Sequence, residues 1–256
     1  MKSVTITRFP EVGYACAEAL NTLCTSITFS GENVKRVLIT SCHSSEGKSY
    51  LSMNIMRTLA GFGKTVALID ADMRLSGITT RYGLAFADEK RTGLSHMLAG
   101  MAEPEQVIYE TDIPGAYIVP VGRLVSNTMP LLNSPRFVQL LDTLSGIAEY
   151  VIIDTPPLGE IVDAKQIAKF CDAAVIAVKY NSVHRSELID VKEQLEATGC
   201  LVLGTVLNKV DMESYMNRKY YHKHEYGKYD HYGKNDTGHS SLGRMRIFRK
   251  KSGKAK

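Results

Sequence analysis

Short apolar runs alternate along most of the chain with longer stretches in which apolar residues recur three or four positions apart. The clearest run is Tyr150–Asp154, and a typical helical stretch is residues 14–29. Strands that alternate with helices are typical of a parallel sheet covered on both faces. The pattern therefore predicts an α/β fold of three layers with a mostly parallel central sheet. The predicted strands are 34–40, 65–69, 117–121, 150–154, 173–178 and 201–207, and the predicted helices are 14–29, 50–60, 94–98, 136–145, 161–170 and 187–198.

The pattern changes at both ends of the chain. The apolar residues of positions 1–10 show no regular spacing, so this segment is expected to form a short arm. After Asp211 aliphatic residues almost disappear, and six of the 13 tyrosines fall within residues 215–232. Such a composition cannot build a core, so this segment is expected to be disordered. The sequence thus predicts an N-terminal arm and helix over 1–30, a main domain over 31–211, and a disordered tail, tyrosine-rich and then basic, over 212–256.

Composition and charge exclude several classes of protein. The hydrophobic fraction of 44% and the charged fraction of 23% are those of a soluble globular protein. The formal net charge is +4, and removing the seven cations of residues 244–256 leaves −3 for residues 1–243, which argues against a nucleic-acid surface. No apolar run reaches the roughly 18 residues of a membrane helix, and the N-terminus does not resemble a secretory signal. Five scattered cysteines favour a reducing compartment, so the expected location is cytoplasmic.

The stretch Cys42–Ser49 stands between a predicted strand and a predicted helix and ends in Gly-Lys-Ser. Gly-Lys-Ser alone also occurs at ordinary helix starts, but the flanking strand and helix favour a phosphate-binding P-loop. Gly47 lets the backbone approach a phosphate, Lys48 reaches the β- and γ-phosphates, and the Ser49 hydroxyl is placed to ligate Mg²⁺. Main-chain N–H groups supply the remaining anion donors. The predicted nucleotide contacts are Ser44, Ser45, Glu46, Gly47, Lys48, Ser49 and Tyr50.

Polar residues follow the predicted strands at the edge where parallel sheets bind ligands. Asp70 and Asp72 follow the strand 65–69, and Asp154, before Thr-Pro-Pro, has the setting of a Walker B carboxylate. A solvated turn after the strand would also explain Asp70 and Asp72. We favour a functional role, because two acids at alternating positions point toward the same edge of the sheet. We assign Asp154 and Asp72 to Mg²⁺, and Asp70, with Asp72 as the alternative, to accept a proton. Asn208 ends the last strand, where it either contacts a purine ring or serves as a turn residue.

Together these motifs resemble the bacterial protein-tyrosine kinases of polysaccharide-export systems. The resemblance runs from about Ala17 to Asp211 and includes the tail. It rests on a Walker A′ motif beside a C-terminal tyrosine cluster, which distinguishes these kinases from the related partition and septum-site ATPases. Those ATPases carry an extra lysine where this chain has His43. The matching segments are 39–49, 68–74, 151–157, 163–164 and 204–208.

The resemblance implies ATP and Mg²⁺ as ligands and catalytic roles for Lys48, Asp70, Asp72 and Asp154. It implies a membrane-embedded activator of the polysaccharide co-polymerase type, a cognate phosphotyrosine phosphatase, and a location at the inner face of the membrane. Seven cations around a few apolar residues in 244–256 suit an anionic leaflet. The implied acceptors are Tyr215, Tyr220, Tyr221, Tyr226, Tyr229 and Tyr232.

The chain departs from the family pattern at two places. Ser44 and Ser45 replace the usual Pro-Gly of the P-loop. The family's first-helix motif, which supports ring assembly, would require arginines at Asn21 and Cys24 after Glu18, so the prediction is only a possible homo-oligomer. A partition-type ATPase and a nucleotide-binding regulatory adaptor without kinase activity are the alternative functions.

Overall fold

The computed structural model describes residues 2–88 and 91–210. The chain divides into two units, Met1–Val210 and Asp211–Lys256, and the predicted tail lies outside the described residues. The strands are β1 (Lys2–Ile6), β2 (Arg36–Ser41), β3 (Val66–Asp70), β4 (Leu84–Phe86), β5 (Tyr109–Thr111), β6 (Ala116–Val119), β7 (Tyr150–Asp154), β8 (Ala173–Lys179) and β9 (Leu201–Asn208). The helices are α1 (Tyr14–Thr28), α2 (Lys48–Gly61), α3 (Ile78–Arg81), α4 (Leu94–Leu98), α5 (Pro104–Val107), α6 (Met129–Leu132), α7 (Pro135–Ile147), α8 (Asp163–Ala168) and α9 (Arg185–Glu196).

All described strands join one sheet in the order β4-β1-β5-β6-β3-β7-β2-β8-β9. Only the β1–β4 and β5–β6 pairs are antiparallel in this part of the chain, so the sheet is mostly parallel, as the sequence predicts. Strand β7 lies between β2 and β3, although it is distant from both in sequence. The strand before the P-loop and the strand before the paired acids therefore flank the same third strand.

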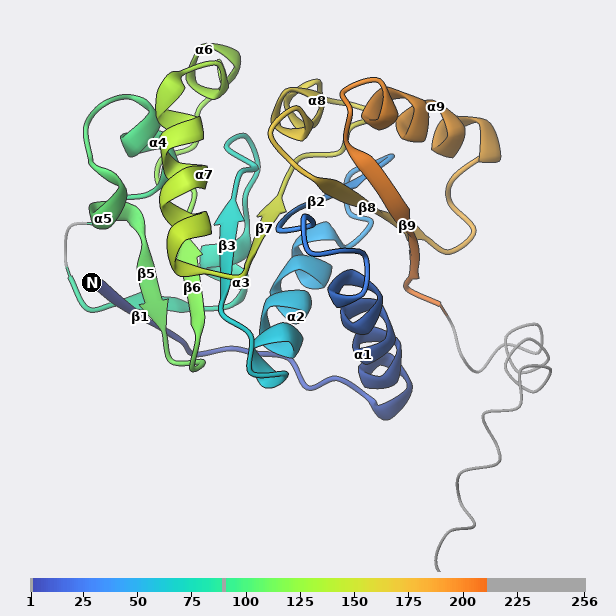
Figure 1. Ribbon diagram of the computed structural model, residues 1–256, viewed down its shortest axis with the longest axis horizontal. Coiled ribbons are helices and arrows are strands. Elements are labelled where there is room, and N and C mark those ends of the chain that lie inside the picture. Colours follow the sequence, from blue (N-terminus) through green and yellow to red (C-terminus); the bar gives the residue numbers. More distant parts are fainter. Residues whose placement is uncertain (1, 89–90, 211–256) are drawn as a thin grey trace, which may run out of the picture. The chain divides into compact units, whose positions relative to one another are not determined.

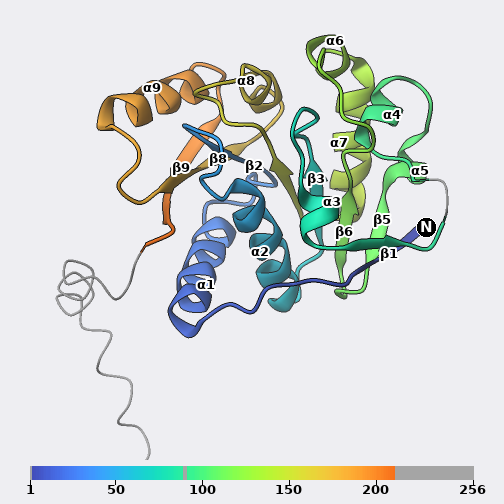
Figure 2. The same ribbon diagram turned by 180° about the vertical axis from the view of Figure 1, so that it is seen from behind.

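Helices cover both faces of the central sheet (Figures 1 and 2), and alternate residues of β2 belong to two separate apolar clusters. In β2, Leu38 belongs to the cluster that contains residues of α7, α8 and α9, whereas Val37 and Ile39 belong to the cluster that contains residues of α1 and α2. Strands buried on both faces read as continuous apolar runs, which is why this part of the sequence shows no two-residue alternation. The three-layer α/β prediction is confirmed.

The structure contains short elements that the sequence did not predict, namely β1, β4, β5, α3, α5 and α6. Residues 2–6 form β1 rather than an arm, because this strand pairs with both β4 and β5 and buries Val4 and Ile6. The single-turn helix α6 lies between β6 and α7. Among the described residues, no helix is long and apolar enough to cross a membrane.

Candidate active site

The P-loop starts where β2 ends and turns into α2 through Gly47. This glycine is the N-cap of α2 and has a left-handed backbone with φ of 97°. A Cβ at this position would collide with the side chain of Asn208. Both observations require glycine here, and they leave the first turn of α2 with open N–H groups that suit an anion.

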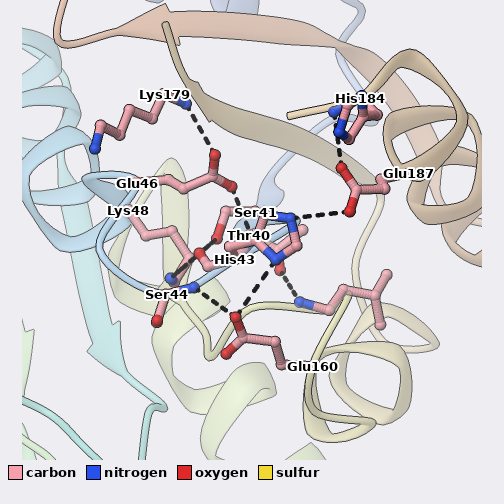
Figure 3. Close-up of polar contacts among 11 residues, drawn as sticks. Thr40, Ser41, His43, Ser44, Glu46, Lys48, Glu160, Lys179, His184 and Glu187 are labelled. Carbon is pink, nitrogen blue, oxygen red and sulfur yellow. Dashed lines mark hydrogen bonds and ion pairs between the residues drawn. The ribbon is translucent and has the colours of Figure 1, made fainter. Parts of the chain in front are cut away.

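Glu46 holds the loop in place rather than extending into solvent (Figure 3). Its buried carboxylate accepts hydrogen bonds from the main-chain N–H of His43 at 2.9 Å and of Lys179 at 3.0 Å. Its carbonyl accepts a bond of 2.9 Å from Asn208 Nδ2. The amide of Asn208 therefore supports the P-loop, and its predicted contact with a purine stays a prediction.

Lys48 lies at the centre of the site. Its side chain is buried, and Nζ donates to Ser41 Oγ at 3.0 Å and to the His43 carbonyl at 3.5 Å (Figure 3). Burial lowers the pKa of Lys48, and the nearby carboxylates of Asp154 and Asp72 oppose this shift. The ammonium is thus placed among neutral oxygens and close to carboxylates, where it can meet a phosphate.

Asp154 ends β7 directly beneath the P-loop. It is 1% exposed, and Ser52 Oγ donates to its Oδ1 at 2.9 Å. Burial raises the pKa of Asp154 to about 6, against the effect of hydrogen bonds with Ser49 and Ser52 and of the Lys48 charge. Such a carboxylate is stabilised by a further cation.

Asp70 and Asp72 differ in accessibility. Asp70 is fully buried, its Oδ2 accepts a short hydrogen bond from Ser76 Oγ, and its Oδ1 has no partner among the described residues. Burial, and after it the charge of Asp154, raises the pKa of Asp70 well above its usual range. Asp72 is half-buried and its Oδ1 accepts the N–H of Leu75 at 3.0 Å. The unpaired oxygen and the raised pKa values mark a place where positive charge is missing.

Arg74 lies within the Walker A′ segment but is fully engaged with the protein. It forms a bidentate pair with the buried Asp163, with Nε–Oδ2 of 2.9 Å and Nη2–Oδ1 of 3.1 Å. It also donates to the Ser126 carbonyl and to Thr128 Oγ1, both at 2.8 Å. The guanidinium therefore ties the loop after β3 to α8.

The side chains and N–H groups around the P-loop can be compared with those that a magnesium nucleotide requires. Among residues 2–88 and 91–210, no group of three His, Cys, Asp or Glu side chains forms a metal site by itself. Mg²⁺ commonly takes one or two carboxylates and completes its shell with phosphate oxygens and water. The Ser49 hydroxyl, the buried Asp154 and the open N–H groups of α2 fit that mode of binding.

Several residues around the P-loop were missed by sequence reasoning. The His43 imidazole lies between Glu160, with Nδ1–Oε1 of 3.5 Å, and Glu187, with Nε2–Oε1 of 3.3 Å (Figure 3). Glu160 Oε1 also accepts the Ser44 N–H at 3.1 Å, and Lys209 Nζ donates to the Ser45 carbonyl at 2.8 Å. The partners are more than 100 residues apart along the chain, so no local pattern could have indicated these contacts.

A buried P-loop lysine beside a strand-terminal carboxylate defines a P-loop nucleotide-binding protein. The chain matches the family model described as the CobQ/CobB/MinD/ParA nucleotide binding domain over residues 37–228. It is 37% identical over 217 residues to tyrosine-protein kinase CpsD of Streptococcus pneumoniae, covering 85% of this chain and 92% of that protein.

Solved structures give the same result. The kinase domain of Escherichia coli tyrosine kinase ETK aligns with a TM-score of 0.71 at 27% identity, over 78% of this chain and 77% of that one. The chimerical protein CapA2B2 aligns with a TM-score of 0.70 at 30% identity, over 80% of this chain and 92% of that one. The chain belongs to the CobQ/CobB/MinD/ParA nucleotide-binding family and, within it, to the bacterial tyrosine-protein kinases.

Proposed function

We propose that this chain transfers the γ-phosphoryl group of ATP to tyrosines of its own C-terminal cluster and thereby regulates capsular or exopolysaccharide synthesis and export. The observation that carries the proposal is the buried Lys48, which lies among hydroxyl and carbonyl oxygens and close to carboxylates. Phosphoryl transfer requires mainly positioning and charge neutralisation, and this arrangement supplies both.

The binding roles follow from the donor set. Main-chain N–H groups of residues 44–50 would hold the phosphates, and Lys48 would neutralise charge that develops on the γ-phosphate. Ser49 and Asp154, with Asp72 directly or through water, would hold Mg²⁺, which when bound neutralises phosphate charge. Asn208 would border the base, since it touches the loop at Glu46.

For the proton acceptor we keep Asp70, with Asp72 as the alternative. The raised pKa of Asp70 favours proton uptake, whereas the partial exposure of Asp72 favours access by a phenol. Asp70→Asn keeps the size of the side chain and removes its basicity. A large loss of transfer with nucleotide affinity mostly kept would support Asp70, and transfer at the wild-type rate would move the role to Asp72.

The proposed acceptors lie in the tyrosine-rich tail, and transfer between two copies of the chain would bring them to the site. They are Tyr215, Tyr220, Tyr221, Tyr226, Tyr229 and Tyr232. We further propose a membrane-embedded activator of the co-polymerase type, a cognate phosphatase, and a place at the inner face of the membrane. The basic residues 244–256 would strengthen that placement, and deleting them should reduce binding to anionic vesicles at low salt.

One experiment separates the proposal from its rivals. Purified protein is incubated with Mg²⁺-ATP, and phosphotyrosine and released phosphate are measured in parallel. A tyrosine kinase gives phosphotyrosine, a partition-type ATPase gives only free phosphate, and an adaptor gives neither. Lys48→Met should abolish phosphotyrosine and keep the fold, while Lys192→Met, which changes an exposed lysine paired with Glu196 on α9, serves as the matched control.

A further inference from the structure

A cavity lined partly by Ser76, the hydrogen-bond partner of Asp70, has no assigned role. Its volume is about 680 Å³, and its walls come from α3, from β4, from the start of α4 and from the segment after β6. The walls carry two arginines, Arg91 and Arg123, and the hydroxyls of Thr79 and Thr80. No aspartate or glutamate is among the described residues that line it. The cavity therefore offers cations and hydroxyl donors without a competing carboxylate.

The two arginines differ from the paired arginines elsewhere in the fold. Arg36, Arg74 and Arg136 each contact a carboxylate, whereas neither Arg91 nor Arg123 forms an ion pair within residues 2–88 and 91–210. Both are exposed. Guanidinium groups without a carboxylate partner suit a phosphate, which accepts bonds from both nitrogens of the fork.

An aromatic ring forms part of the same wall. The guanidinium carbon of Arg91 lies 5.6 Å from the centroid of the Phe86 ring. The main chain at Arg123 is held by a hydrogen bond of 2.9 Å from its N–H to Ser95 Oγ. A cavity that combines two arginines with an aromatic surface can receive both the phosphate and the ring of an aryl phosphate.

The cavity reaches the catalytic carboxylates through one side chain. Ser76 lines the cavity, and its hydroxyl donates to Asp70 Oδ2. Its N–H donates to the Asp72 carbonyl at 3.0 Å. Ser76 therefore links the wall of the cavity directly to the proposed proton acceptor.

We propose that this cavity binds the phosphate ester of a tyrosine already phosphorylated in residues 215–232 of a second copy of the chain. Most neighbouring tyrosines of that segment are three to five residues apart, which an extended chain spans in roughly 10–18 Å. The bound phosphotyrosine would hold the next tyrosine at the carboxylates, so phosphorylation of several tyrosines would proceed from one encounter. This inference rests on the proposed acceptors, whose own test is the mapping of phosphate in the products.

The charge of residues 215–232 favours binding of the phosphorylated segment over the unphosphorylated one. Residues 215–232 carry Arg218, Lys219, Lys223 and Lys228 against Glu225 and Asp230. The unmodified segment is therefore net cationic and is repelled by two arginines. Each phosphate adds about −1.5 to −2 charges and creates the attraction.

The test measures binding without turnover. A peptide of residues 215–232 phosphorylated at Tyr226, its unphosphorylated twin, phenyl phosphate and inorganic phosphate are titrated into the full chain by calorimetry. Excess Mg²⁺-ADP keeps phosphate groups away from the P-loop. The full chain should bind the phosphopeptide at least about tenfold more tightly than its twin, because charge-assisted hydrogen bonds to phosphate are strong. Phenyl phosphate should bind more tightly than inorganic phosphate.

Substitutions then locate the site. Arg91→Ala and Arg123→Ala should each weaken phosphopeptide binding about tenfold. Arg185→Ala should not change it, because α9 packs against β9, at the opposite end of the strand order from β4. Because Arg91 also packs over Phe86, Arg91→Lys is included, and it should bind with intermediate affinity since it keeps the charge but loses the fork. Equal phosphopeptide affinity of the double alanine variant and the wild type would overturn the proposal. So would equal binding of phenyl phosphate and inorganic phosphate.

Discussion

Asp70 and Asp154 are paired residues on the neighbouring strands β3 and β7, and both side chains are buried. Ala71 continues the contact, since its N–H donates to the Asp154 carbonyl at 2.8 Å. The charge of Asp154 adds to burial in raising the cost of ionising Asp70, whereas burial dominates at Asp154 and the Lys48 charge offsets only part of it. Burying these two carboxyl groups therefore costs stability at the place where a magnesium nucleotide would bind.

The first prediction follows from the pKa of Asp154, which is raised to about 6. An unfolded aspartate has a pKa of about 4, so the folded protein holds this proton more tightly. Ionisation therefore destabilises the fold as the pH rises from about 4 through about 6, and above that the penalty is complete. Asp154→Asn should raise the free energy of unfolding at pH 7.5 by on the order of 3 kcal/mol, and by only about 1 kcal/mol at pH 4.5.

Urea unfolding of both proteins at the two pH values, without nucleotide, checks this prediction. Glu149→Gln is the control, because its exposed carboxylate has a pKa lowered first by a hydrogen bond from Lys64. Its contribution has the opposite sign, present at neutral pH and lost in acid. An Asp154→Asn effect that is the same at both pH values would contradict the prediction.

The second prediction concerns Ser45, which has a left-handed backbone with φ of 60° where the family has glycine. A side chain in this conformation costs roughly 1 kcal/mol, and glycine removes that cost. Part of the gain in stability is offset, because a glycine makes the unfolded chain more flexible. Ser45→Gly should therefore raise the free energy of unfolding by about 0.5–1 kcal/mol. Asn181→Gly, with φ of 55°, is the matched control outside the P-loop, and it should gain less because asparagine tolerates this region. A destabilised Ser45→Gly protein would show that the serine side chain, rather than its backbone, is needed.

Much of this fold is readable from sequence because its central strands are buried on both faces. β7 and β3 are continuous apolar runs, and the acids that follow them lie where parallel strands end. β1 was missed because its five residues bury only Val4 and Ile6 and its partners are remote strands of three residues. The P-loop and the carboxylates were likewise predicted from local motifs, whereas the supporting contacts of Glu160 and Lys209 depend on tertiary packing.

The third prediction concerns the Arg74–Asp163 pair. Asp163 has a side-chain exposure of 0%, so Arg74→Ala leaves a buried carboxylate with Thr128 as its remaining side-chain hydrogen-bond donor. Breaking a buried pair from one side typically costs about 3–5 kcal/mol, and the partial exposure of Arg74 argues for the lower end. The exposed Arg136–Glu103 pair, at 3.5 Å, is the control, and Arg136→Ala should cost less than about 1 kcal/mol. A double-mutant cycle with Asp163→Asn measures the coupling energy, and a coupling near zero would contradict the assigned role of the pair.

The last prediction concerns which tyrosines receive phosphate. Tyr82 and Tyr109 are fully buried within the fold, so they cannot reach the catalytic edge of another copy without unfolding. Tyr14 is 83% exposed, but its backbone is held in the first turn of α1, which limits how far its hydroxyl can reach. The tail tyrosines lie in a segment whose composition predicts no fixed structure, so several of them can enter a site in turn.

Mass spectrometry after incubation with Mg²⁺-ATP should therefore place phosphate on several tyrosines of residues 215–232, with little on Tyr14. Replacing the six tail tyrosines by phenylalanine should remove most phosphotyrosine, while Tyr14→Phe should leave the yield unchanged. Phosphate found mainly on Tyr14 would instead mean that exposure on a helix suffices and that the tail is not the acceptor.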